Sequence, residues 1–150
     1  MFRGVSNINI DVKGRFGVPS RFRDFLVNHC RGEMVVTIDT EEKCLLIYPR
    51  PDWDDIQRRV EALPSFNAVT RGVQRLVIGH ATDVQMDASG RVLLPPPLRT
   101  YANLEKKGIL IGQGKKMELW DESAWNNKRD IWVEEGQNLG IPEELAGLSL

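Results

Sequence analysis

A five-residue pattern occurs twice in the sequence, with an aspartate four positions before an arginine and a glycine directly before that arginine. The first copy runs from Asp11 to Arg15 and the second from Asp87 to Arg91; we call them the first tip and the second tip. Aspartate accepts hydrogen bonds from backbone N–H groups two residues on, and glycine adopts positive φ, so the pattern predicts a tight turn. A turn needs no arginine, however, whereas a guanidinium can grip phosphate or donate twice to guanine. The pattern therefore points to DNA binding at two turns.

Some residues of the tips point to a role in DNA binding more clearly than others. For both aspartates and both glycines, a structural role in the turn explains the residues as well as DNA contact does. The two arginines, by contrast, are better explained by DNA contact than by the needs of the turn. Lys13 adds a positive charge to the first tip, where the second tip has Ser89. We therefore expect the first tip to contribute more to DNA binding than the second.

The tips belong to a longer internal repeat. Every residue of the first tip lies 76 positions before its counterpart, and the match continues through Pro19 and Pro95. Two aromatic residues per half then match at an offset of 72 positions: Tyr48 with Trp120, and Trp53 with Trp125. Matched blocks in the same order indicate a duplicated unit.

Hydrophobic spacing predicts the elements that carry the tips. A half-buried strand containing Ile8 and Ile10 leads into the first tip, and Pro19 and Pro95 fit the first turn of short helices. Paired strands are expected at 34–38 with 45–48 and at 109–111 with 117–120, and amphipathic helices at 52–63, 67–79 and 122–133. Units of about 75 residues rarely bury enough apolar surface alone. We therefore predict an α+β fold, a pseudo-two-fold β barrel with peripheral helices.

Composition excludes several other classes of protein. No apolar run approaches the roughly 20 residues that a membrane helix needs, and the first residues lack a signal-peptide pattern, so we expect a cytoplasmic protein. Two cysteines and two histidines without metal-ligand spacing predict no metal and no cofactor; Cys44 fits a core position, and Cys30 is interpreted as incidental. The segment from Gly112 to Lys116 lacks the spacing of a phosphate-binding loop, and no nucleophile or paired carboxylates stand out, so we expect no enzyme. The four tryptophans are interpreted as packing residues.

Charge is unevenly distributed along the chain. There are 20 basic and 21 acidic residues, a net charge of −1, which by itself gives no support to nucleic-acid binding. Before Met34, however, six basic residues face three acidic ones, and the acidic excess lies near the C-terminus. Arg3 and Lys13 belong to this basic segment and are counted among the expected DNA-binding residues.

The chain also resembles the MraZ family, from residue 1 to about residue 133. The resemblance is carried by Met1–Gly4, Asp11–Arg15, Pro19, Arg21, Tyr48–Pro49, Arg71–Ala81, Asp87–Arg91 and Glu118–Asp121. It implies two AbrB-like swapped-hairpin domains in tandem and a ring-like homo-oligomer in the cytoplasm, associated with the nucleoid. It also implies binding of short G-rich direct repeats in double-stranded DNA upstream of the division and cell-wall gene cluster, with repression of that cluster and of the protein's own gene.

Carried onto this sequence, the resemblance makes Arg15 and Arg91 the DNA-contacting residues, with Asp11 and Asp87 organising the tips. We divide the chain into a first repeat with its linking helix (1–80), a second repeat with its C-terminal helix (81–133) and an acidic tail (134–150). One alternative function remains: an oligomeric scaffold that uses the same tips to bind another protein.

Overall fold

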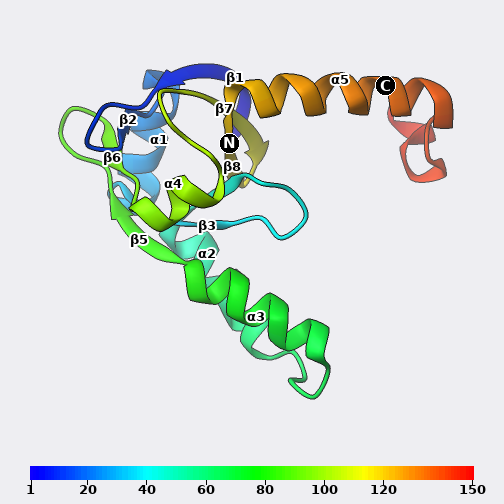
Figure 1. Ribbon diagram of the computed structural model, residues 1–150, viewed down its shortest axis with the longest axis horizontal. Helices are drawn as coiled ribbons and strands as arrows, with labels where there is room; N and C mark the ends of the chain where they lie inside the picture. The colour runs from blue at the N-terminus through cyan, green and yellow to red at the C-terminus, as the bar shows by residue number, and fades with distance from the viewer.

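The computed structural model describes residues 1–150, and the chain passes twice through the same succession of elements (Figure 1). The first half comprises β1 (Phe2–Asn9), β2 (Arg15–Gly17), α1 (Ser20–Cys30), β3 (Glu33–Ile38), β4 (Leu45–Pro49) and α2 (Arg50–Glu61). Helix α3 (Ala68–His80) connects it to the second half. That half comprises β5 (Thr82–Gln85), β6 (Arg91–Leu93), α4 (Pro96–Tyr101), β7 (Lys107–Gly114), β8 (Lys116–Asp121) and α5 (Glu122–Leu139), followed by the 3-10 helix η1 (Glu143–Leu148).

The two halves exchange strands. The main sheet is antiparallel with the order β1-β7-β8-β4-β3-β5, so β1 pairs only with β7 and β5 pairs only with β3. Each of these edge strands therefore completes the sheet of the other half. Strands β2 and β6 pair with each other as a separate two-stranded ribbon. Neither half could form this arrangement alone, which agrees with the small size of each repeat.

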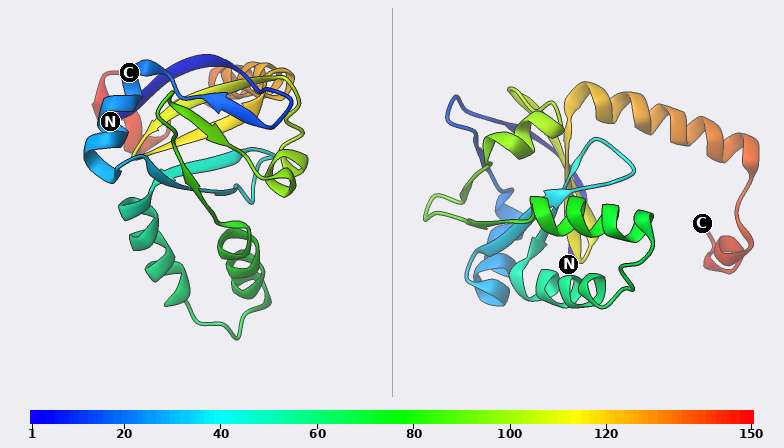
Figure 2. Two further views of the ribbon diagram at one scale, coloured as in Figure 1. Left: turned by 90° about the vertical axis from the view of Figure 1, so that its left-hand side faces the viewer. Right: turned by 60° about the horizontal axis from the view of Figure 1, so that its bottom comes forward.

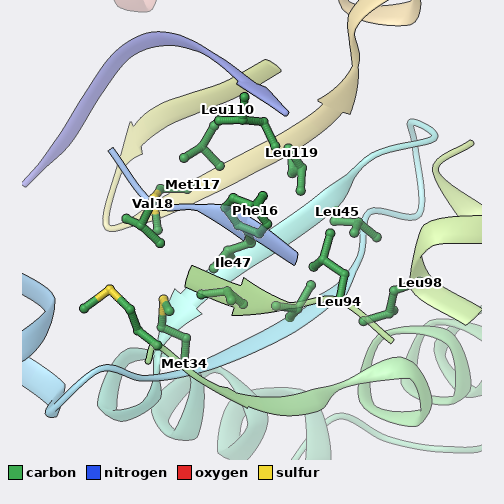
Figure 3. Close-up of a cluster of buried hydrophobic side chains, with 14 of the residues drawn as sticks. Phe16, Val18, Met34, Leu45, Ile47, Leu94, Leu98, Leu110, Met117 and Leu119 are labelled. Atoms are coloured by element: carbon green, nitrogen blue, oxygen red, sulfur yellow. The ribbon is translucent and has the colours of Figure 1, made fainter. Parts of the chain in front are cut away.

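The predicted α+β class is confirmed, whereas closure into a barrel is not. Because β1 and β5 each have one neighbour, the six-stranded sheet is open at both ends. The β2–β6 ribbon is a separate sheet and extends neither edge strand. It packs against the six-stranded sheet as a second layer (Figure 3). The pseudo-two-fold relation is nevertheless plain, because the strand order reads the same from either end after the halves are exchanged.

The main core fills the space between the ribbon and the six-stranded sheet (Figure 3). Phe16 and Val92 are cross-strand partners in the ribbon, and both are buried. Alternation along a strand explains why their neighbours Gly17 and Arg91 are more exposed. Sheet residues from both halves complete the cluster: Met34, Leu45, Ile47, Leu110, Met117 and Leu119. One shared core thus fixes the ribbon, and with it both tips, to the rest of the protein.

Helices cover the sheet or project from it. Helix α1 buries Phe22, Leu26 and Cys30, a spacing of four residues that places them on one face. Pro19 and Pro95 directly precede the first helical residue rather than lying in the first turn as predicted, although Pro96 and Pro97 occupy that turn in α4. The pair α2 and α3 projects on one side and α5 on another, as both further views show (Figure 2).

The structure corrects two sequence-based interpretations. Helix α5 continues to Leu139 rather than ending at Val133, so six residues of the predicted tail are helical. Cys30, interpreted as incidental, is buried at the end of α1 and belongs to the main core; Cys44 is fully buried as predicted. No helix combines the length and the apolar character needed to cross a membrane.

The aromatic pairs that revealed the repeat occupy matching places. Tyr48 packs against Trp53 with ring centroids 5.6 Å apart, and Trp120 packs against Trp125 at 5.7 Å. Trp132 adds an edge-on contact to the second pair while remaining 39% exposed. The tryptophans are therefore packing residues, as predicted, with Trp132 the least buried of those in the second cluster.

Candidate nucleic-acid interface

The first tip is a turn built around the carboxylate of Asp11. Its Oδ1 accepts hydrogen bonds from the backbone N–H groups of Lys13 and Arg15, each at 2.9 Å. The backbone closes the same turn, because the Asp11 N–H donates to the Arg15 carbonyl oxygen and the Gly14 N–H donates to the Asp11 carbonyl oxygen. Gly14 has φ of 90°, a conformation that side-chain-bearing residues rarely adopt. The predicted turn and its glycine requirement are both confirmed.

The second tip repeats this geometry. Asp87 Oδ1 accepts from the N–H groups of Ser89 and Arg91 at 2.9 and 2.8 Å, and Gly90 has φ of 78°. Backbone hydrogen bonds also link the two tips across the ribbon, from the Val18 N–H to the Gly90 carbonyl oxygen and from the Leu94 N–H to the Gly14 carbonyl oxygen. Each tip is therefore anchored to the strand that leaves the other tip.

The two arginines are held differently. Arg15 Nε donates to Asp11 Oδ2 at 2.9 Å, which fixes the direction of the guanidinium. Arg91 Nε lies 3.3 Å from Asp87 Oδ2, close enough for an ion pair, but the alignment is poor and this buried nitrogen has no hydrogen-bond partner. A hydrogen bond weakens steeply when it bends, so this contact is weaker than its distance alone suggests. Arg15 therefore has the better-aligned contact with its aspartate of the two.

Electrostatics keep both tip aspartates ionised. The backbone N–H of Arg15, followed by its side-chain hydrogen bond, holds the pKa of Asp11 below its usual value. For Asp87 the backbone N–H groups of Arg91 and Ser89 lower the pKa in the same way. Each carboxylate offsets part of the charge of its arginine, so the terminal guanidinium nitrogens remain the donors available to an external anion.

The ribbon places both tips on one side of the molecule. In the antiparallel register, Arg15 lies opposite Leu93 and Arg91 lies opposite Gly17, so the two arginines are offset by two residues along the ribbon, roughly 7 Å. Both tip loops protrude at the left of Figure 1, far from α5 and the C-terminus.

The other predicted site residues lie in different places. Lys13 is exposed within the first tip. Arg3 lies near the start of β1, opposite Gln113 and six residues before the strand ends at Asn9.

Two further arginines lie at the tips, and the sequence-based site prediction omitted them. Arg23 Nε donates to the Val18 carbonyl oxygen at 2.8 Å, and Arg99 Nε donates to the Leu94 carbonyl oxygen at 3.0 Å. Their side chains cross between halves, because Arg99 covers Gly14 and Arg23 covers Gly90. The signal was present in the repeat, since Arg23 and Arg99 match at the same offset of 76 positions as the tips.

One other cluster has side chains of the kind that bind metals. Polar atoms of Asp39, Cys44 and Glu118 lie within 4.8 Å of one another. The Cys44 thiol lies 3.7 Å from Asp39 Oδ2, and Glu118 accepts a hydrogen bond from Trp120 Nε1. Burial holds the pKa of Cys44 well above its usual value. The thiol is therefore neutral rather than the thiolate that binds metals.

Comparison with known proteins identifies the family that carries this arrangement. A family model described as "MraZ protein, putative antitoxin-like" matches the chain twice, over residues 1–76 and 77–131. The chain belongs to the MraZ family. Full-length relatives include the transcriptional regulator MraZ of Alkalilimnicola ehrlichii, 54% identical with both chains completely covered. The proteins of the same name from Coxiella burnetii and Legionella pneumophila are 50% and 51% identical, again over the whole of both chains.

Each of the two MraZ segments contains one tip. The boundary between them falls within α3, the helix that joins the halves. The two segments together cover every strand of the sheet and of the ribbon. Because β1 and β5 each pair with the other segment, the two matched units form one folded body rather than two separate ones.

Proposed function

We propose that this chain is a sequence-specific DNA-binding transcriptional regulator that contacts double-stranded DNA through Arg15 and Arg91. The observation that carries the proposal is the pairing of the two tips on one ribbon, each presenting an arginine within ion-pair distance of the tip's aspartate on the same side of the molecule. The name of the full-length relatives, transcriptional regulator MraZ, supports it independently. The sequence-based expectation that the chain is not an enzyme agrees with its membership of the MraZ family, whose full-length relatives are named transcriptional regulators.

The geometry suggests how a tip reads DNA. A two-stranded ribbon fits the major groove, where a guanidinium can donate to both O6 and N7 of guanine. Asp11 holds Arg15 in one orientation before DNA arrives, which reduces the entropy lost on binding. Lys13, exposed beside it, supplies a contact to phosphate that positions the tip without reading sequence. Arg3 is kept as a candidate for a phosphate contact away from the tips.

The target genes and the sign of regulation come from the resemblance to the MraZ family. On that basis we propose that the chain represses the division and cell-wall gene cluster, including its own gene, by binding short direct repeats at the nucleoid. A single pair of tips offers few base contacts, so several linked copies in a ring-like homo-oligomer raise the effective concentration on repeated sites. Apolar side chains available for self-association include Phe66 just before α3, Val69 in the first turn of α3 and Leu139 at the end of α5, all strongly exposed.

Fluorescence anisotropy with the chain's own upstream DNA tests the DNA-binding function. The account expects tighter binding to that DNA than to a scrambled duplex of equal length at the same salt. Equal, weak binding to both duplexes, together with capture of a protein through the tips, would favour the scaffold alternative. Sedimentation should show assemblies larger than a dimer at micromolar concentration, and monomers alone, with and without DNA, would overturn the ring.

A further inference from the structure

The strand exchange carries basic residues of the second half to the first tip. Arg99, in α4, lies directly against Gly14. The Lys106 carbonyl oxygen accepts a hydrogen bond from the Ile10 N–H at 2.8 Å, one residue before the tip begins. Lys107 is the cross-strand partner of Asn9 at the end of β1. Two hollows, of about 760 and 520 Å³, adjoin this region, and Arg99 lines both of them.

None of these basic side chains forms an ion pair with an acidic residue of the protein. Lys13, Lys106 and Lys107 are exposed, and none lies within ion-pair distance of an acidic side chain. Arg99 uses Nε for the Leu94 carbonyl oxygen, and its terminal nitrogens have no acidic partner. Three acidic residues line the hollows beside these cations: Asp11, Glu105 and Asp83. Asp11 is already paired with Arg15. Asp83 lies 3.7 Å from Arg50, so part of its charge is already offset.

The second tip has no comparable set. Ser89 stands where the first tip has Lys13, and Arg23 stands where it has Arg99. The register places Glu33 opposite Gln85, as Lys107 is opposite Asn9, and the Met86 N–H donates to Gly32, as Ile10 donates to Lys106. Four basic residues and, besides the tip's own Asp11, two acidic residues, Glu105 and Asp83, thus surround the first tip. The matching positions around the second tip hold two basic residues and one acidic residue: Arg23, Arg31 and Glu33.

We propose that Lys13, Arg99, Lys106 and Lys107 form a phosphate-binding surface, composed from both halves, that holds the DNA backbone next to the base pairs contacted by Arg15. The proposal rests on the proposed function and deepens it, because it assigns the non-specific part of the affinity to named residues. Unpaired, exposed cations around a DNA-reading turn match the chemistry of phosphate contacts, which position a protein on the duplex. The surface is present at one tip only, so the protein engages its DNA asymmetrically.

The test uses two matched double variants of the full chain. Lys106→Gln with Lys107→Gln removes two side-chain charges without touching the backbone hydrogen bond of Lys106. Lys115→Gln with Lys116→Gln removes the same charge at the opposite end of β7, where Gln113 pairs with Lys116. Anisotropy is measured against salt on the upstream DNA and on a scrambled duplex, and thermal melts establish that both variants are folded.

The first double variant should bind both duplexes more weakly, by up to about 30-fold at 0.15 M salt, with a salt slope smaller by up to about two. The second double variant should bind like the wild type. Wild-type affinity and slope in the first variant, with wild-type preference for the upstream DNA intact, would overturn this surface and leave the proposed function standing. Equal losses in both variants would also overturn it, since the effect would then be one of total charge. Absence of any preference in the wild type would overturn the function and the surface together.

Discussion

The Arg99 guanidinium covers Gly14, although the two residues belong to different halves of the repeat: a Cβ placed on Gly14 would stand 2.7 Å from Arg99 Cζ. Gly90 is covered in the same way by Arg23. Each tip is thus closed by an arginine from the helix of the opposite half. The turn that presents Arg15 is supported by packing that only the interleaved fold supplies.

Replacement of Gly14 should therefore destabilise the protein. Gly14→Val combines an unfavourable positive φ with a steric clash against Arg99, and we expect a loss on the order of 1–3 kcal/mol in the free energy of unfolding. Denaturant unfolding measures the loss. Gly136→Ala in α5, where nothing lies within 4 Å of the added atom, is the control and should be neutral or slightly stabilising. A Gly14→Val variant as stable as the wild type would contradict the turn geometry.

Gly112 tests the exchange of strands itself. An added Cβ would overlap the backbone of Phe2 and Arg3 in β1, and backbone cannot move aside as a flexible side chain can. Gly112→Ala should displace the first part of β1 and lower stability by more than about 2 kcal/mol. Relative to the wild type, amide hydrogen exchange in the variant should become faster in β1, with little change in β3 and β4. Uniformly unchanged protection of β1 would contradict the pairing of β1 with β7.

The pH dependence of the first tip follows from the lowered pKa of Asp11. A carboxyl whose pKa is lower in the folded state contributes stability above its unfolded pKa, and this contribution is lost as the pH falls through the folded pKa. Asp11→Asn should therefore be less stable than the wild type at pH 7, and the difference should shrink below about pH 4. NMR titration should also show that Arg15→Ala raises the pKa of Asp11 toward its usual value. An Asp11 pKa unaffected by loss of Arg15 would mean that the side-chain hydrogen bond is absent in solution.

The duplication and the tips were readable from the sequence because they depend on local chemistry. Asp11, Gly14 and Arg15 specify a turn by themselves, and the repeat at 76 positions predicts a second one. Hydrophobic spacing likewise predicted α3, which begins one residue later than expected behind the cap formed by Asn67. These features need no knowledge of which strand pairs with which.

What depends on strand pairing could not be predicted from local pattern. The residues give no sign that Lys107 lies opposite Asn9 or that Arg99 covers Gly14, because both contacts arise only when the halves interleave. The end of α5 was missed for a different reason: beyond Val133 the helix has no buried face, so hydrophobic periodicity cannot mark it. Barrel closure failed as a prediction because the ribbon forms its own layer.

The claim that the tip arginines read DNA is tested most directly by fluorescence anisotropy measured against salt concentration on upstream and scrambled DNA. The proteins compared are the wild type, Arg15→Ala, Arg15→Lys and Arg91→Ala, and thermal melts confirm that each variant is folded. Arg15→Ala should weaken binding to upstream DNA by about 10- to 100-fold, more than Arg91→Ala does, because Arg15 is held by a well-aligned hydrogen bond to its aspartate and lies among more positive charges. Arg15→Lys should keep the affinity for scrambled DNA but weaken the preference for the upstream sequence, since a flexible ammonium lacks the rigid, planar fork with which a guanidinium matches O6 and N7 of guanine. A uniform loss on both duplexes, with a salt slope smaller by about one, would reduce Arg15 to a phosphate contact. Equal losses from Arg15→Ala and Arg91→Ala would refute the asymmetry, and unchanged binding by a folded Arg15→Ala variant would contradict the DNA-reading role of the tips altogether.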